Sequence, residues 1–139
     1  ILIKSKKLGN DSRELIESYN LLGQVGIITG KFGEAEKYIR KSLDITSKNF
    51  TENSIRYTEI LRTLSALHKD LGDYKKALET ENQIFKTQVA VLGEGHIDLA
   101  ATLTRLAMLQ LYSGNDIQMA ERHLLKAKGI IERNIGAQS

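Results

Sequence analysis

The chain has 139 residues, 41% of them apolar and 27% charged, which is enough to bury the core of about one domain under a polar surface. It contains no cysteine, which excludes a disulfide scaffold, a thiolate metal site and a cysteine nucleophile, and which fits a cytoplasmic protein. The formal charge of +3 comes entirely from Lys4, Lys6 and Lys7; because the rest is neutral, we do not expect direct nucleic-acid binding.

The first third of the chain predicts two helices. The apolar and lysine-rich residues 1–8 resemble the end of a helix from a preceding unit, so we expect the chain to be a piece of a longer array. Apolar residues at helical spacing then predict helices over 12–29 and 32–48, with Gly30 at the turn between them. Four glycines, Gly23, Gly26, Gly30 and Gly33, follow no strand, and we interpret them as marking close helix approach rather than a phosphate loop.

The remaining two thirds repeat this pattern twice. Ser54 is a candidate N-cap for a helix that extends to Leu71, Gly72 and Asp73 break it, and a second helix runs from about Tyr74 to Leu92. Further helices are predicted over 97–113 and 117–134, with a turn at 114–116. The chain contains no proline, as is typical of long helices joined by short turns.

The chain superimposes on itself at an offset of 42 residues. Gly30 falls on Gly72 and then on Gly114, and Leu22 falls on Leu64 and then on Leu106. One extra residue enters after Gly114, which brings Ala77 onto Ala120. We therefore expect a single repeat domain over 1–139, with units of about 9–50, 51–92 and 93–136, and an all-α fold of about six helices plus an N-terminal helical remnant.

The repeated positions resemble the tetratricopeptide repeat family. Bulky and small residues alternate at spaced positions of each helix pair, and a Leu-Gly-x-x-His sequence at 92–96 joins two units. The long period resembles the repeats of kinesin light chains and of clustered-mitochondria (Clu) proteins. In the first unit the family positions are held by Tyr19, Leu22, Gly23, Gly30, Phe32, Ala35, Ile39 and Ser42.

This resemblance implies a helix-turn-helix solenoid that winds as a right-handed superhelix, with the first helix of each unit lining the concave face. It implies a scaffold that binds a protein or peptide in this groove. The residues themselves set no nucleophile beside a base and form no apolar run long enough to span a membrane, so we expect no catalysis, cofactor, metal or membrane contact. The family's groove positions correspond here to Glu17, Asn20, Leu21, Gln24, Glu59, Arg62, Thr63, Ala66, Lys69, Thr104, Arg105, Met108, Leu111 and Tyr112.

Within this groove, Arg62 and Arg105 are candidates to hold an acidic side chain, with Met108, Leu111 and Tyr112 as an apolar anchor. The alternative is that the two arginines only pair with Glu17 or Glu59, which would leave a neutral surface.

Two other functions remain open: a structural or oligomerisation segment, and a regulatory helical domain of a larger protein, including a Clu-type RNA-associated protein. We expect exposed apolar repeat ends, near residues 1–8 and near Ile130, Ile131 and Ile135, to favour self-association.

Four single residues need separate interpretation. His68, His96 and His123 are not spaced as metal ligands, and we interpret them as structural. Glu81 occupies a core position that is Ile39 in the first unit and Leu124 in the third. Because a buried carboxylate needs a partner, we expect Glu81 to reach the surface or to accept a hydrogen bond from a neighbouring helix.

Overall fold

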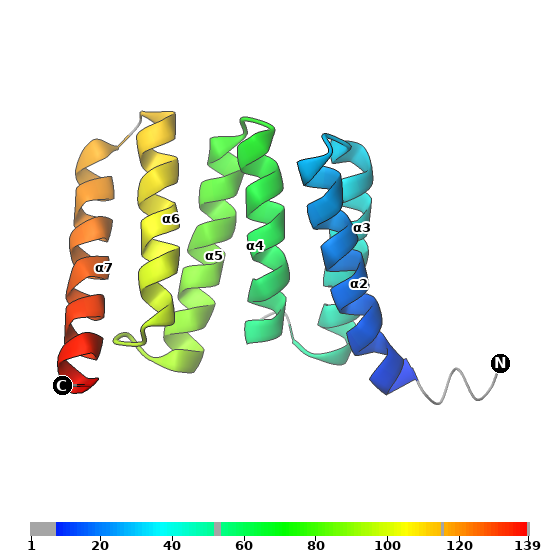
Figure 1. The fold of residues 1–139 in the computed structure, drawn as a ribbon, viewed down its shortest axis with the longest axis horizontal. Coiled ribbons are helices and arrows are strands. Elements are labelled where there is room, and N and C mark those ends of the chain that lie inside the picture. The colour runs from blue at the N-terminus through cyan, green and yellow to red at the C-terminus, as the bar shows by residue number, and fades with distance from the viewer. Residues whose placement is uncertain (1–7, 52–53, 115, 139) are drawn as a thin grey trace.

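A computed structural model of the chain describes residues 8–51, 54–114 and 116–138, which form six α-helices and no strand (Figure 1). None of the helices in these ranges is long and apolar enough to cross a membrane. In chain order the helices are α2 (Leu8–Ile28), α3 (Phe32–Asn49), α4 (Ile55–Asp70), α5 (Tyr74–Leu92), α6 (Asp98–Ser113) and α7 (Ile117–Gln138).

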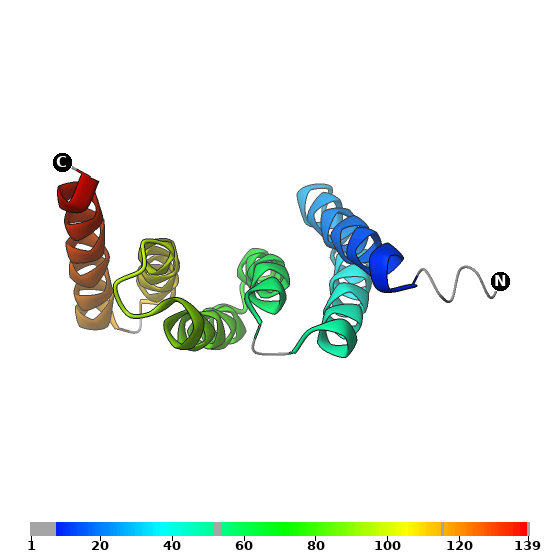
Figure 2. The same ribbon diagram turned by 90° about the horizontal axis from the view of Figure 1, so that it is seen from below.

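Helices α4 to α7 stand side by side in chain order and α2 lies in front of α3 at the other end of the row, each helix antiparallel to the next (Figure 1). Packing is mostly between neighbours in this row, and α2 also touches α4. The row is curved when seen from below, with α4 and α6 toward its concave side and α5 toward its convex side (Figure 2). This is the solenoid architecture that the sequence predicts, in which each helix pair buries its apolar faces against its neighbours.

Short turns separate the two helices of each pair. Gly30, Gly72 and Gly114 stand at equivalent places in these turns with φ between 69° and 79°, a conformation in which a β carbon would be strained. The predicted cap is present: the Ser54 hydroxyl accepts the Tyr57 N–H at 3.1 Å. Asp73 caps α5 in the same way, accepting the N–H of Lys76.

Buried apolar residues form two clusters along the row. The larger cluster joins α2, α3, α4 and α5, and the smaller joins α6 and α7, with Phe85 and Val89 of α5 packed against it. Small residues permit the close crossing of α2 and α3: a β carbon on Gly26 would lie 2.8 Å from the Ala35 Cβ, and one on Gly23 would lie 2.6 Å from the Ile39 Cγ1. The interpretation of Gly23 and Gly26 as sites of close helix approach is therefore confirmed.

The predicted helix positions agree with the structure, with two corrections. The first helix of the row, α2, begins at Leu8 rather than at residue 12; the helical remnant predicted ahead of it falls on residues 1–7, with Lys4, Lys6 and Lys7, which lie outside the described residues. Ile130, expected at an exposed end, is fully buried because it packs into the α6–α7 cluster, whereas Ile131 and Ile135 are exposed.

Candidate functional site

The concave side carries a hollow between α4 and α6, called here the α4–α6 hollow. Helical spacing places its lining residues on one face of each helix, since positions three, four and seven apart lie on the same side. Its volume is ≈ 80 Å³, and its walls are predominantly apolar with cationic groups beside them. The lining residues are Arg62, Ser65, Ala66 and Lys69 on α4, and Arg105, Met108 and Leu109 on α6.

A second hollow lies next to the first, between α2 and α4, with a volume of ≈ 300 Å³; it is called here the α2–α4 hollow. Arg62 and Ala66 border both hollows, so the two are contiguous along α4. The other lining residues are Gln24, Ile27, Ile28 and Thr63. The concave side therefore offers a continuous path from α2 to α6, with the Arg62 guanidinium at its centre.

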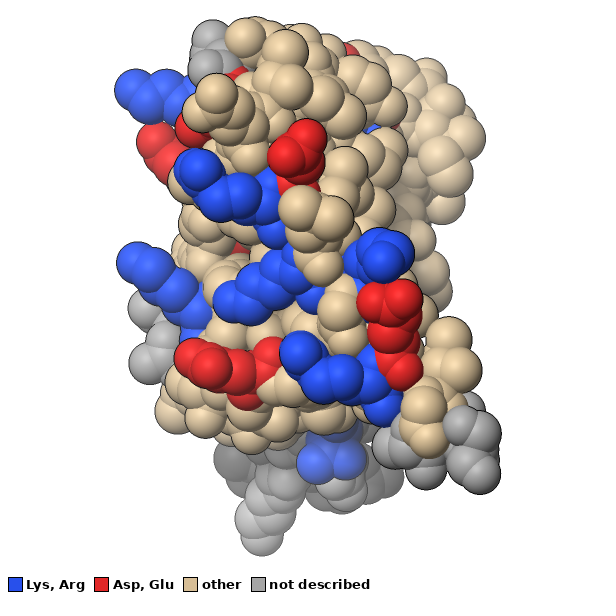
Figure 3. Space-filling model, turned by 90° about the vertical axis from the view of Figure 1, so that its left-hand side faces the viewer, with Lys and Arg blue, Asp and Glu red and all other residues tan. Residues whose placement is uncertain are grey.

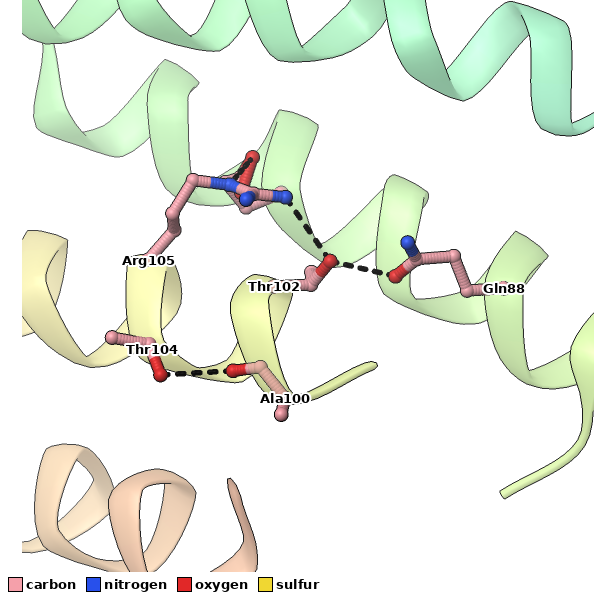
Figure 4. A network of polar contacts seen from close by, with 6 residues as sticks. Gln88, Ala100, Thr102, Thr104 and Arg105 are labelled. Carbon is pink, nitrogen blue, oxygen red and sulfur yellow. Dashed lines mark hydrogen bonds and ion pairs between the residues drawn. The ribbon is translucent and has the colours of Figure 1, made fainter. Parts of the chain in front are cut away.

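Arg105 is held by a buried carboxylate on α5. Its Nε donates to both oxygens of Glu81, at 2.8 and 3.1 Å, and its terminal NH2 group donates to the Thr102 hydroxyl at 3.1 Å (Figure 4). The Thr102 hydroxyl in turn donates to Oε1 of Gln88 at 2.6 Å. The expectation that Glu81 accepts a hydrogen bond from a neighbouring helix is therefore confirmed, and the network fixes α6 on α5.

The electrostatics around Glu81 reflect its burial. The side chain is fully buried, and desolvation raises the pKa of its carboxyl because burial penalises the charged form. The positive charge and hydrogen bonds of Arg105 oppose this rise, and so does the positive charge of Arg62 across the hollow. Arg105, whose side chain is 33% exposed, is therefore chiefly the partner of Glu81.

The unmatched positive charge of the hollow belongs to Arg62 and Lys69. Both side chains are exposed, and no ion pair between described residues includes either of them. The alternative pairing of the arginines with Glu17 or Glu59 is likewise absent from that part of the chain. The hollow therefore presents cationic groups beside an apolar floor that includes the side chain of Met108, which is 40% exposed.

The structure separates the three residues predicted as one apolar anchor. Met108 lines the α4–α6 hollow, whereas the Tyr112 ring lies against Tyr74 of α5 with 6.1 Å between ring centroids. Leu111 borders a different hollow, between α6 and α7. Only Met108 therefore stands beside Arg62 and Lys69.

The other predicted groove residues differ in whether their side chains are free to contact a ligand. Glu17 and Glu59 are exposed, and Asn20 is half-buried, with an Oδ1 that has no hydrogen-bond partner among the described residues. Thr63 is buried although it borders the α2–α4 hollow. The Thr104 hydroxyl is already used, donating to the Ala100 carbonyl at 2.8 Å (Figure 4).

Sequence reasoning missed four lining residues of the two hollows, Ser65, Leu109, Ile27 and Ile28. It also missed Gln88 and Thr102 as partners in the network. The sequence did contain a signal for Gln88 and Thr102. They are polar residues on two predicted neighbouring helices, one on each of the sides that face each other. Such matched polar positions indicate a hydrogen bond across the junction, because each would otherwise be buried without a partner.

Two of the three histidines make polar contacts through their rings, and the third is buried. His96 Nδ1 accepts the Asp98 N–H at 3.1 Å at the start of α6, and His123 Nδ1 lies 3.1 Å from the Gln110 amide oxygen. His68 is buried on α4, and burial lowers its pKa. Within the described ranges no three histidine or carboxylate side chains gather as a metal-binding group.

Three comparisons with known proteins bear on the fold. The family model described as tetratricopeptide repeat matches residues 14–88. No curated protein sequence matches the chain. Among solved structures, BtubC (BKLC) from P. vanneervenii matches 88% of this chain and 48% of its own, with 23% identity and a TM-score of 0.77.

A kinesin light chain-like protein from Podosopora anserina, with nearly identical TPR-like repeats, also matches 88% of this chain and 57% of its own, with 20% identity and a TM-score of 0.75. The chain thus spans about half the length of the solved structures it matches. At these identities the likeness shows the same fold.

Proposed function

The chain belongs to the tetratricopeptide repeat family, and we propose that it is a binding module whose concave side holds an extended segment of a partner protein. The ligand we infer carries acidic side chains next to apolar ones. The observation that carries this proposal is the exposed Arg62 guanidinium, which borders both hollows and forms no ion pair with a described residue. The lack of cysteine supports action in the cytoplasm, where thiols stay reduced and disulfides are rare.

The chemistry of the two hollows favours this ligand class. A guanidinium can hold a carboxylate by two parallel hydrogen bonds, and Lys69 adds a point charge at the same hollow. An apolar side chain one or two positions away in the ligand reaches Met108 in the α4–α6 hollow or Ile27 in the α2–α4 hollow. Extended concave surfaces of stacked repeats suit such linear segments.

The groove residues proposed to contact the ligand form two groups. Gln24, Arg62, Lys69 and Met108 line the hollows directly, and we place the main contribution there. Glu17, Asn20, Glu59 and Thr104 remain proposed contacts along the same helices. We assign Arg105 a smaller part in binding because its guanidinium already holds Glu81.

The test uses fluorescence anisotropy with labelled peptides that contain Asp or Glu beside Leu or Phe. Reversing both unpaired charges, Arg62→Glu with Lys69→Glu, should weaken binding by about tenfold or more, because attraction becomes repulsion. Lys37→Glu with Lys86→Glu, the same two charge reversals at exposed positions of α3 and α5, is the matched control and should leave binding unchanged. If the doubly reversed variant binds every peptide as the parent does, the concave side is not the binding site.

A further inference from the structure

The α4–α6 hollow carries more positive charge than its own contacts balance. Three cationic side chains line it, Arg62, Lys69 and Arg105. Of these three, only Arg105 forms an ion pair with a described residue, and its partner is the buried carboxylate of Glu81. Three cations against one carboxylate leave the hollow with an excess of two positive charges.

The α2–α4 hollow shows that the packing of successive repeats does not require these cations. Both hollows lie between the first helices of neighbouring units, and the 42-residue period relates one to the other. It carries the three cationic positions onto Asn20, Ile27 and Thr63, none of which is charged. Arg105 is accounted for by its ion pair. The other two cations therefore add charge that neither the fold nor the ion pair uses.

The two guanidiniums of the hollow act on the same place. The Nε of Arg105 donates to Glu81 and a terminal nitrogen donates to Thr102, which fixes the plane of the guanidinium, while its remaining N–H groups donate to no described residue (Figure 4). The positive charge of Arg62 also acts on the Glu81 carboxyl, where it opposes the rise of the pKa that burial causes. Two like charges beside a single carboxylate repel each other, and an anion bound beside them relieves this repulsion.

We propose that the α4–α6 hollow binds a phosphorylated side chain, a phosphoserine of the partner segment, and this inference rests on the binding function proposed above. A phosphate monoester carries a charge of about −1.5 to −2 at pH 7 and three acceptor oxygens. It therefore matches the excess of two positive charges, whereas one aspartate or glutamate balances half of it. Arg62 can hold two of the oxygens by parallel hydrogen bonds, Lys69 adds a point charge, and the unused N–H groups of Arg105 are further donors.

The surroundings of the hollow favour a phosphorylated protein segment over a nucleic acid. A polyanion is held by Lys and Arg side chains spread along a basic face. On the side of the molecule that α7 presents, Lys, Arg, Asp and Glu are interspersed with uncharged surface between them (Figure 3), and from residue 8 onward the sequence carries no formal net charge. The hollow itself is small, ≈ 80 Å³, and it places Met108 and Leu109 beside the cations, which suits one phosphate next to an apolar side chain.

The test compares labelled peptides of one sequence by fluorescence anisotropy. Each peptide has Leu or Phe next to a position that holds phosphoserine, glutamate or serine. The phosphoserine peptide should bind about tenfold more tightly than the glutamate peptide, because it brings a second charge and further charge-assisted hydrogen bonds. A peptide with two adjacent glutamates should also bind more weakly than the phosphoserine peptide, since the small hollow favours one compact dianion.

The pH dependence of binding separates a phosphate from a carboxylate. The second ionisation of phosphoserine has a pKa of about 6, whereas a glutamate side chain stays ionised down to about pH 5. Lowering the pH from 7.5 to 5.5 should therefore weaken phosphoserine binding by about threefold or more relative to glutamate binding. The charged groups that face the ligand, Arg62, Lys69, Arg105 and Glu81, act on both peptides, so the ratio of the two affinities is the readout.

Variants of the chain locate the phosphate in the hollow. Arg62→Gln with Lys69→Gln should abolish the preference for phosphoserine over glutamate, because the two excess charges are removed. Lys37→Gln with Lys86→Gln, the same loss of charge at exposed positions of α3 and α5, is the matched control and should preserve the preference. All four positions are exposed, so helicity at 222 nm should not change.

The possible results distinguish this inference from the binding function on which it rests. A peptide with one or two glutamates that binds as tightly as the phosphoserine peptide would overturn the phosphate inference and leave the binding function intact, whereas equal binding of the phosphoserine, glutamate and serine peptides would overturn both. A phosphoserine preference that survives Arg62→Gln with Lys69→Gln places the phosphate elsewhere, and a single-stranded oligonucleotide that displaces the phosphopeptide assigns the hollow to nucleic acid. Either of these two results refutes the proposal.

Discussion

Removing Arg105 should expose how much the α5–α6 junction depends on one ion pair. Arg105→Met leaves the fully buried Glu81 carboxylate without the guanidinium that holds both of its oxygens. Breaking a buried pair in this way costs about 3–5 kcal/mol, and because Arg105 is partly exposed we expect a value near the lower limit, about 3 kcal/mol. For a chain of this size that corresponds to a fall in Tm of about 6–12 °C.

The stability lost in Arg105→Met should depend on pH. Loss of Arg105 raises the folded pKa of Glu81 further above the value of the unfolded chain, since the arginine opposes the effect of burial. The folded state then holds its proton more tightly than the unfolded state. The loss of unfolding free energy in Arg105→Met relative to the parent should therefore be largest at a pH above the pKa of Glu81 in the folded variant. It should shrink as the pH falls through that pKa.

The assay is urea unfolding followed by circular dichroism at 222 nm, at pH 8 and at pH 5. The double variant Glu81→Leu with Arg105→Met puts an apolar pair in place of the ion pair and should recover most of the lost stability, because an apolar pair can replace a buried ion pair at little cost. If the double variant is as unstable as Arg105→Met, the loss comes from packing around the arginine stem and the electrostatic reasoning is wrong.

Three further predictions concern other parts of the row. Gly26→Ala should destabilise the chain by about 1–3 kcal/mol, because its β carbon meets Ala35 at 2.8 Å, whereas Gly33→Ala, with nothing within 4 Å, should be neutral or stabilising in the same urea titration. Burial lowers the pKa of His68, so stability should fall as pH drops below about 6.5, and His68→Gln should reduce this loss in unfolding measured between pH 7.5 and 5.5. Amide hydrogen exchange should be faster over residues 15–28 of α2 than over 99–112 of α6, which is packed between α5 and α7; equal protection would contradict this.

The helices were predictable because their signals are local. Apolar spacing, a turn glycine and a polar cap recur in each unit, and each acts within a few residues of itself. The start of α2 was misjudged because Leu8 aligns with positions that end a helix in later units, while its own backbone continues into α2.

The site was less predictable because it depends on neighbours. Residues 108, 111 and 112 share one side of an isolated helix, yet 111 and 112 point about 100° apart around the axis. In the row α7 lies beside Leu111, and α5 lies beside Tyr112. The flanking helices therefore decide which hollow or neighbour each of these residues contacts. The partner of Glu81 was open for the same reason, because Arg62 and Arg105 both come from helices next to α5.

The Glu81–Arg105 ion pair distinguishes the α5–α6 junction from the α3–α4 junction, where Ile39 and Thr63 stand at the equivalent positions. A buried ion pair adds little net stability compared with an apolar pair, so the Glu81–Arg105 contact has more effect on which helix follows which. If α6 packed on a helix with leucine at the Glu81 position, the guanidinium would be desolvated without a carboxylate; if α2 packed on α5, the carboxylate would lose its guanidinium. Because α3 carries Ile39 and α4 carries Thr63 at these positions, α6 finds a carboxylate partner for Arg105 on α5 and not on α3, which favours the observed order of the helices along the row.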